Sequence, residues 1–385
     1  MMPRRVMSPL LAAVLRRLSI GNLAIAAALA GCSSGPAPLP DLPEIASPAG
    51  GKVLWQLDVG RSVEFALVPA VVGDALFAAA HDGTVVRVDP KTGQEAWRVA
   101  AGGKISAGVG ASADLVVVGT LDGRVIALTA GGKVLWTVRV SSEVSGAPLI
   151  ARNLVVVRTV DNRVFGLNPA DGKRRWVYQR AAPALMVRTP AGAVADQNHI
   201  YAGFPGGKLV ALLASNGGLR WEGTVSLPKG TTELERVSDV VGEPWLAERE
   251  VCAVSFQGRA ACFDSNTGAG LWTKDVSSTS SLTGDGRVVF VSESKGAVAA
   301  LNRSTGANVW RQDKLTRRAL SAPLPFGRFV ALGDGQGFVH LLDRETGAFV
   351  GRVTTDGSPI TASPRRIEAG FVVQTRRGTL YAIGV

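Results

Sequence analysis

The stretch LDGRVIALTAGGKVLW (121–136) contains the two signals on which the fold depends. Its first half, LDGRVIAL (121–128), places a D-G turn before a run of apolar and β-branched residues, which is typical of a tight β-hairpin. Its second half, TAGGKVLW (129–136), turns again at a glycine pair and ends on Trp136. The stretch therefore predicts consecutive short antiparallel strands.

Tryptophans that end similar strings recur along the chain. The intervals are 42, 39, 40, 45, 51 and 38 residues for the series Trp55, Trp97, Trp136, Trp176, Trp221, Trp272 and Trp310. Strings such as DSNTGAGLW (264–272) and NRSTGANVW (302–310) place one Asp or Asn at the same position of each turn, and DRETGAFV (343–350) has Val350 in the Trp position. We expect the Asp or Asn side chains to form Asx turns. We expect the side chains in the Trp position to pack between neighbouring repeats.

Glycine-centred hairpin strings precede the tryptophan strings, and eight can be recognised: HDGTVVRV (81–88), LDGRVIAL (121–128), VDNRVFGL (160–167), FPGGKLVAL (204–212), FQGRAACF (256–263), SKGAVAAL (294–301), GQGFVHLL (335–342) and RRGTLYAI (376–383). Four short strands in each repeat predict an all-β fold, an eight-bladed β-propeller with four antiparallel strands per blade. The orphan GKVLWQLDV (51–59) supplies the strand that GTLYAIGV (378–385) lacks, so we expect the N-terminal strand to pair with the C-terminal strands and close the ring.

The N-terminus reads as a targeting segment. Residues 1–31 are basic and then apolar, and LAIAAALA (23–30) is followed by Gly31 and Cys32, the order of a lipoprotein signal peptide whose cysteine becomes lipidated. Ser33 resembles the residue found in lipoproteins destined for the outer membrane, so we expect lipid anchoring at its periplasmic face. Residues 32–50, with the lipidated cysteine and a proline-rich run, are expected to be a flexible tether, and residues 51–385 the propeller.

Composition argues against several classes of function. The net charge of +11 falls to +7 without the four arginines of residues 1–31, which is a weak basis for binding nucleic acid. His81, His199 and His340 are far apart and lack metal-ligand spacing, and no nucleophile elbow or phosphate-binding loop is present. We therefore predict no catalytic residues, no metal and no cofactor.

Cys252 and Cys262 flank one of the hairpins. A two-residue turn at Gln257-Gly258 would place them on opposite faces of the sheet and argues against a disulfide, whereas a three-residue loop would reverse that conclusion.

The largest departure from the repeat is SLPKGTTELERVSDVVGEPW (226–245), which contains the helix-like string TELERV. Insertions in propellers lie in loops at one face, where partners bind. One blade earlier, QRAAPALMVRTPAG (179–192) places apolar residues beside an arginine in a segment between blades.

The D-x-x-T-G-x-x-x-W string resembles the repeat of quinoprotein alcohol dehydrogenases. The whole chain resembles more closely the BamB family of lipoproteins in the β-barrel assembly machinery, through the lipid-attachment motif, the short linker, the eight repeats, and the strings GTTELERVSDV (230–240) and SAPLPFGRFVALGDGQGFVHLLDRETG (321–347). This resemblance implies a non-catalytic scaffold that binds the periplasmic POTRA domains of the barrel insertase, together with other assembly lipoproteins, and aids insertion of unfolded outer-membrane proteins.

The resemblance also implies the partner-binding residues Leu185, Val187, Arg188, Arg236 and Asp239. The family has a second acid two residues after this aspartate, where this chain has Val241. A quinone-dependent or other propeller enzyme and a glycan-binding envelope lipoprotein remain as alternatives, to be tested by cofactor absorbance and by glycan binding.

Overall fold

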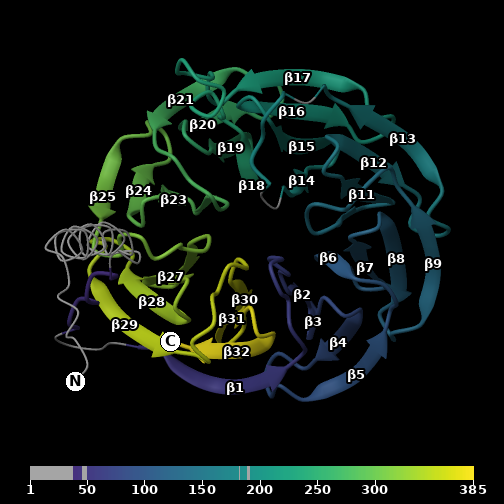
Figure 1. Cartoon of the computed structure of the whole chain (residues 1–385), viewed down its shortest axis with the longest axis horizontal. Coiled ribbons are helices and arrows are strands. Elements are labelled where there is room, and N and C mark those ends of the chain that lie inside the picture. The colour runs from purple at the N-terminus through teal and green to yellow at the C-terminus, as the bar shows by residue number, and fades with distance from the viewer. Residues whose placement is uncertain (1–37, 46–49, 182, 189–190) are drawn as a thin grey trace, which may run out of the picture. The chain divides into compact units, whose positions relative to one another are not determined.

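The structure is a computed structural model that describes residues 38–45, 50–181, 183–188 and 191–385. The regular elements of these residues are 32 β-strands in eight four-stranded antiparallel sheets. Figure 1 shows the sheets of residues 50–385 arranged as blades around a central axis. The predicted eight-bladed propeller is confirmed. The predicted signal peptide and Cys32 lie outside the described residues.

The first four blades follow one another in chain order, each built from its innermost to its outermost strand (Figure 1). Blade 1 contains β2 (Ala70–Val72), β3 (Ala75–Ala79), β4 (Thr84–Val88) and β5 (Glu95–Ala100). Blade 2 contains β6 (Ile105–Ala111), β7 (Leu115–Thr120), β8 (Arg124–Thr129) and β9 (Val134–Arg139). Blade 3 contains β10 (Leu149–Ala151), β11 (Leu154–Arg158), β12 (Arg163–Leu167) and β13 (Arg174–Gln179). Blade 4 contains β14 (Ala193–Ala195), β15 (His199–Phe204), β16 (Lys208–Leu213) and β17 (Leu219–Thr224).

The remaining blades repeat this order until the last, which takes its outer strand from the start of the propeller. Blade 5 contains β18 (Val240–Ala247), β19 (Glu250–Ser255), β20 (Arg259–Asp264) and β21 (Gly270–Asp275). Blade 6 contains β22 (Thr283–Gly284), β23 (Val288–Ser292), β24 (Val298–Asn302) and β25 (Asn308–Gln312). Blade 7 contains β26 (Leu324–Phe326), β27 (Phe329–Gly333), β28 (Phe338–Asp343) and β29 (Phe349–Thr354). Blade 8 contains β30 (Arg365–Ile367), β31 (Gly370–Gln374), β32 (Thr379–Gly384) and β1 (Lys52–Asp58).

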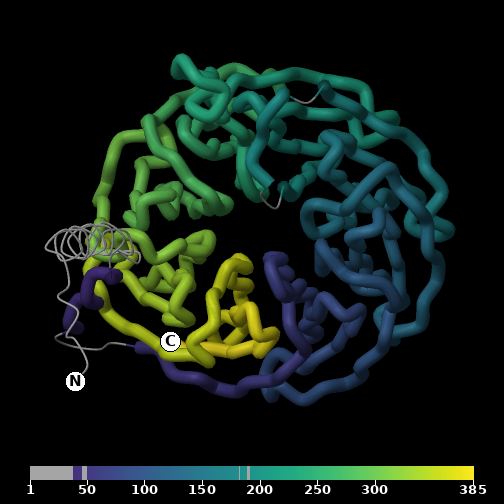
Figure 2. Tube along the Cα trace, viewed as in Figure 1, coloured from purple at the N-terminus to yellow at the C-terminus, as the bar shows by residue number. Residues whose placement is uncertain are grey.

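Closure of the ring occurs within blade 8. Strand β1 pairs antiparallel with β32, from Lys52 opposite Gly384 to Asp58 opposite Thr379. In Figure 2 the purple start of the propeller therefore lies along its yellow end. The pairing leaves the ring without an open blade, as the two terminal sequence fragments predict.

The core is divided among the junctions between blades. Eight clusters of buried apolar side chains are present in the described residues, and each joins two neighbouring blades. The sheet faces thus bury their β-branched side chains against each other, and the propeller derives its cohesion from blade-to-blade packing.

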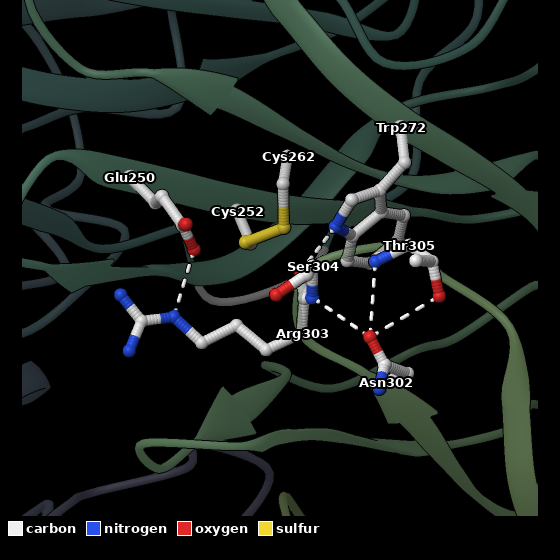
Figure 3. Close-up of a disulfide and its surroundings, with 8 residues drawn as sticks. All are labelled: Glu250, Cys252, Cys262, Trp272, Asn302, Arg303, Ser304 and Thr305. Carbon is white, nitrogen blue, oxygen red and sulfur yellow. Dashed lines mark hydrogen bonds and ion pairs between the residues drawn. A yellow bond between two sulfur atoms is a disulfide. The ribbon is translucent and has the colours of Figure 1, made fainter.

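The tryptophans of the repeat connect the blades as predicted. The indole Nε1 of each donates to a backbone carbonyl in the turn of the following blade, at 2.6 to 3.0 Å, in the pairs Trp55–Pro90, Trp97–Ala130, Trp136–Pro169, Trp176–Ala214, Trp221–Ser265, Trp272–Arg303 and Trp310–Arg344. Figure 3 shows Trp272 against the turn 302–305, whose Asn302 side chain accepts the amides of Ser304 and Thr305.

The turn glycine makes this contact possible. Gly306 has a φ of +69°, and a Cβ there would lie 2.6 Å from the Trp272 ring. Any side chain at this position would be strained by the backbone and would collide with the indole. The glycine of the repeat's T-G pair therefore leaves room for the tryptophan ring of the preceding blade.

The junction between blades 7 and 8 is different. Val350 occupies the tryptophan position and packs into the apolar cluster that joins the two blades. Strands β32 and β1 of blade 8 are not joined by a turn, so there is no turn carbonyl to accept a hydrogen bond from a tryptophan of blade 7. Residue 50 lies close to this junction, since a Cβ on Gly351 would be 2.5 Å from the Gly50 carbonyl oxygen.

The expectation against a disulfide is wrong. Cys252 and Cys262 are directly opposite each other on β19 and β20 and are joined by a disulfide (Figure 3). Pairing of Val254 with Ala260 leaves an odd number of residues at the centre of the hairpin, so the loop is the three-residue type and not the two-residue turn. Both sulfurs lie in the buried cluster between blades 5 and 6.

Part of the expected tether contacts the propeller. Leu42 packs against the apolar cluster between blades 6 and 7, and Arg352 Nη2 donates to the Pro43 carbonyl at 2.8 Å. Packing against the propeller therefore begins before residue 50 in the chain. Among the described residues, no helix has the length and apolar character needed to cross a membrane.

Candidate partner-binding surface

Two segments that connect blades carry the predicted site residues. Residues 180–192 link β13 to β14, and residues 225–239 link β17 to β18 (Figure 1). Asp239 Oδ2 accepts the backbone N–H of Val187 at 2.6 Å, and its Oδ1 accepts that of Gly206 at 3.0 Å. The two segments, although far apart in sequence, therefore meet in one surface.

Asp239 is buried rather than exposed on this surface. It is 3% exposed, and burial raises the pKa of its carboxyl, an effect that the hydrogen bonds from Val187 and Gly206 oppose. Its side chain acts on the surface by fixing the backbone of the connecting segment.

Leu185, Met186 and Val187 give the segment an apolar exposed edge. Leu185 is 47% exposed, Met186 is similarly exposed, and Val187 is half-buried. The Met186 sulfur lies 3.5 Å from Nδ2 of Asn162, a residue of the neighbouring hairpin turn. Exposed apolar side chains held in one conformation are the usual anchors of protein interfaces.

Arg188 adds charge beside this edge. Its guanidinium pairs with the carboxylate of Glu143, which belongs to the segment between β9 and β10, while most of the arginine side chain stays exposed. The pair connects successive linking segments and leaves Arg188 accessible to a partner. The sequence pattern of apolar residues followed by arginine is thus realised as one continuous patch, which we call the 185–188 patch.

The insertion 225–239 forms a turn and not the helix that TELERV suggests. Thr232 and Glu235 make reciprocal capping contacts, and the Arg236 amide donates to the Thr232 carbonyl at 3.2 Å. A single turn is completed before the chain enters blade 5. Arg236 is exposed. Among the described residues no side-chain hydrogen bond or ion pair joins it to the 185–188 patch. Leu234, 71% exposed, lies on the same turn.

A pocket of about 340 Å³ lies beneath the patch, with Met186, Val187 and Arg188 among its lining residues. Arg158, at the end of β11, also lines it and is 5% exposed. Sequence reasoning missed Arg158. An alignment of the repeats would have singled it out, because the equivalent position in the other blades is never charged.

Other polar clusters have structural partners. The buried His340 bonds Asp334 through Nε2 at 2.9 Å, and His81 bonds the Ile105 carbonyl at 2.8 Å. A cavity of about 250 Å³, lined by the residues that precede several inner strands, has Glu64 and Glu243 as its charged side chains. In the part of the chain that the structure describes, no three His, Cys, Asp or Glu side chains gather as metal ligands.

The fold and its seven tryptophan contacts define an eight-bladed β-propeller built from quinoprotein-type repeats. The family model of outer membrane protein assembly factor BamB matches residues 44–104, 81–312 and 294–384. The chain therefore belongs to the BamB family.

Relatives and solved structures agree with this assignment. The BamB proteins of Burkholderia pseudomallei and Nitrosomonas eutropha are 41% and 42% identical over 85% and 86% of this chain, covering 86% and 81% of their own lengths. The crystal structure of BamB from Moraxella catarrhalis has a TM-score of 0.80 at 29% identity, covering 87% of this chain and all of that one. The quinohemoprotein alcohol dehydrogenase of Comamonas testosteroni, at 13% identity and a TM-score of 0.67 over 87% of this chain and 76% of its own, shares the fold.

Proposed function

We propose that this protein is a non-catalytic scaffold of the outer-membrane β-barrel assembly machinery, anchored through lipidated Cys32 at the periplasmic face of the outer membrane. Its 185–188 patch binds the periplasmic POTRA domains of the barrel insertase and so aids insertion of outer-membrane proteins. Membership of the BamB family supports the assembly role, since the relatives are named assembly factors.

The observation that carries the proposal is the 185–188 patch itself. Leu185 and Met186 are exposed beside Arg188, and buried Asp239 holds the backbone between them. An interface built on this patch would bury apolar anchors at its centre, with the arginine selecting an acidic partner surface. Both features favour a protein ligand over a small polar substrate.

The test is co-purification from envelopes solubilised in mild detergent, with an affinity tag on the C-terminus. We expect the barrel insertase and its partner lipoproteins to be recovered with the wild-type protein. Leu185→Asp should reduce recovery of the insertase at least tenfold. Leu271→Asp is the matched control, because Leu271 is equally exposed, at 47%, but lies on the outer strand of blade 5. It should leave recovery unchanged.

Two further results bear on the proposal. Cys32→Ala should abolish incorporation of labelled fatty acid into the protein, because Cys32 is the proposed site of lipid attachment. Failure of the wild-type protein to retain the insertase, from membranes that contain it, would reject the scaffold role. Quinone absorbance in the purified protein would then favour a propeller enzyme, and glycan retention would favour a glycan-binding lipoprotein.

A further inference from the structure

Arg158 is a buried cation without an ionic partner. Its guanidinium stacks on the Phe204 ring at 4.6 Å, and Nη1 reaches the Gly192 carbonyl at 3.4 Å. Its Nε has no hydrogen-bond acceptor, and within the described ranges no carboxylate lies at ion-pair distance. A buried charge of this kind is costly unless something compensates it.

Only blade 3 has a charged residue at this strand position. Strand register makes Arg158 equivalent to Ala79, Gly119, Gly203, Val254, Ser292, Gly333 and Gln374. At the glycines, Val144, Val240 and Ile360 pack over the bare backbone. Blade 3 has a guanidinium in place of that apolar packing, which a purely structural role does not require.

The surroundings of Arg158 indicate what would compensate its charge. The pocket it lines also contains Glu143 and Asp239, but Glu143 is paired with Arg188, and Asp239 is occupied by two backbone amides. Burial lowers the pKa of Arg158 only to about 10, so it stays cationic at neutral pH. Two carboxylates already near the pocket disfavour a dianion and favour a single additional carboxylate.

We propose that Arg158 forms the base of a carboxylate-binding pocket, into which a protein docked on the 185–188 patch inserts an Asp or Glu side chain. The inference rests on the proposed function, because Met186, Val187 and Arg188 of the patch line the same pocket as Arg158. The planar guanidinium matches a carboxylate through two parallel hydrogen bonds, and Phe204 fixes the plane of its fork.

The experiment measures binding of the full-length lipoprotein in detergent to the purified POTRA region of the insertase. Arg158→Met keeps the bulk of the side chain and removes the charge. Its dissociation constant should rise at least tenfold, while its thermal midpoint stays equal to or above that of the wild type. Arg158→Lys keeps the charge but not the planar fork, so its dissociation constant should lie between those of the wild type and Arg158→Met. Arg175→Met, at an exposed arginine of β13 in the same blade, should bind normally.

Double-mutant cycles identify which acidic side chain of the partner enters the pocket. Each Asp and Glu of the POTRA region is changed to its amide, and one of these changes should lose its effect on binding when combined with Arg158→Met. Binding of Arg158→Met within twofold of wild type, while Arg188→Glu binds weakly, would overturn the pocket and leave the proposed function intact. Absence of wild-type binding would overturn both. If Arg158→Met fails to fold, undiminished binding by Arg158→Lys overturns the pocket.

Discussion

The carboxylate of Asp239 accepts the backbone amide of Val187 at 2.6 Å across 52 residues of sequence. The contact joins the segment that precedes blade 5 to the one that precedes blade 4. The backbone of the exposed 185–188 patch is therefore held by Asp239, whose carboxylate is itself buried. Substitutions at the two positions should impair binding for different reasons.

Asp239→Asn should loosen the patch without altering its exposed side chains. An amide accepts at one end only, so one of the two N–H donors, Val187 or Gly206, loses its partner. The expected loss of stability is about 1–2 kcal/mol. Hydrogen exchange at the Val187 amide should accelerate, and affinity for the POTRA region should fall about threefold to tenfold. Unchanged exchange at Val187 would contradict this account of Asp239.

Exchanging the charges of Arg188 and Glu143 separates internal pairing from partner binding. Arg188→Glu alone places two acids together and should weaken POTRA binding at least tenfold. It should change thermal stability little, because the side chain at position 188 is mostly exposed and can turn away from Glu143 into solvent. The double variant, with Glu143→Arg added, restores an internal pair. It should remain defective in binding if Arg188 faces an acidic partner, and recovery of binding would show that the pair matters only internally.

Gly306→Val should destabilise the junction of blades 5 and 6. The new side chain would meet the Trp272 ring and adopt a left-handed backbone, and these two penalties together cost about 3 kcal/mol. Denaturant unfolding measures the loss. Gly270→Val is the control, because no atom lies within 4 Å of a Cβ there. Equal stability of the two variants would argue against the glycine as a seat for tryptophan.

Acid should weaken blade 7 through His340. Burial lowers the pKa of this histidine, against the opposing effect of Asp334, while Arg352 and Arg318 lower it further. The unfolded chain, with an ordinary pKa of about 6.5, therefore takes up more protons as the pH falls through that value, and the folded state loses stability. Burial also raises the pKa of Asp334, but its hydrogen bonds from His340 and the Phe338 and Gln336 amides outweigh this, so it adds a second loss at lower pH.

The measurement is the free energy of unfolding of His340→Gln compared with wild type between pH 7 and pH 5. The variant should show a shallower decline over this range, because the histidine that must be protonated is gone. Parallel curves for His340→Gln and wild type would mean that another group governs the acid response.

Much of the fold was predictable because each blade repeats one physical solution. The Trp272 contact and Gly306 each recur in seven copies, and the Asp or Asn of the Asn302 turn recurs in five, so the copies reinforce a single interpretation. Register was harder to predict, because a turn of two or three residues decides which faces meet. That uncertainty is why Cys252 and Cys262 were expected on opposite faces.

For the candidate site, the sequence predicts the exposure of some residues but not how they are arranged. Leu185 and Arg188 lie exposed where the patterns place them, whereas Asp239 is buried, and burial depends on segments distant in sequence. The string TELERV makes a capped turn, since the capping pair Thr232 and Glu235 starts a helix that the chain leaves at once. Arg158 could have been noticed by aligning the repeats on their hairpins.

The pairing of β1 with β32 sets a condition on when this protein can finish folding. Blades 1 to 7 consist of neighbouring segments and can form as the chain emerges, but blade 8 needs Lys52 and Gly384 together. Until residue 384 is available, β1 has no partner strand and blades 1 and 7 each lack a neighbour. A chaperone that shields this first strand during export would therefore protect the molecule at its most vulnerable stage.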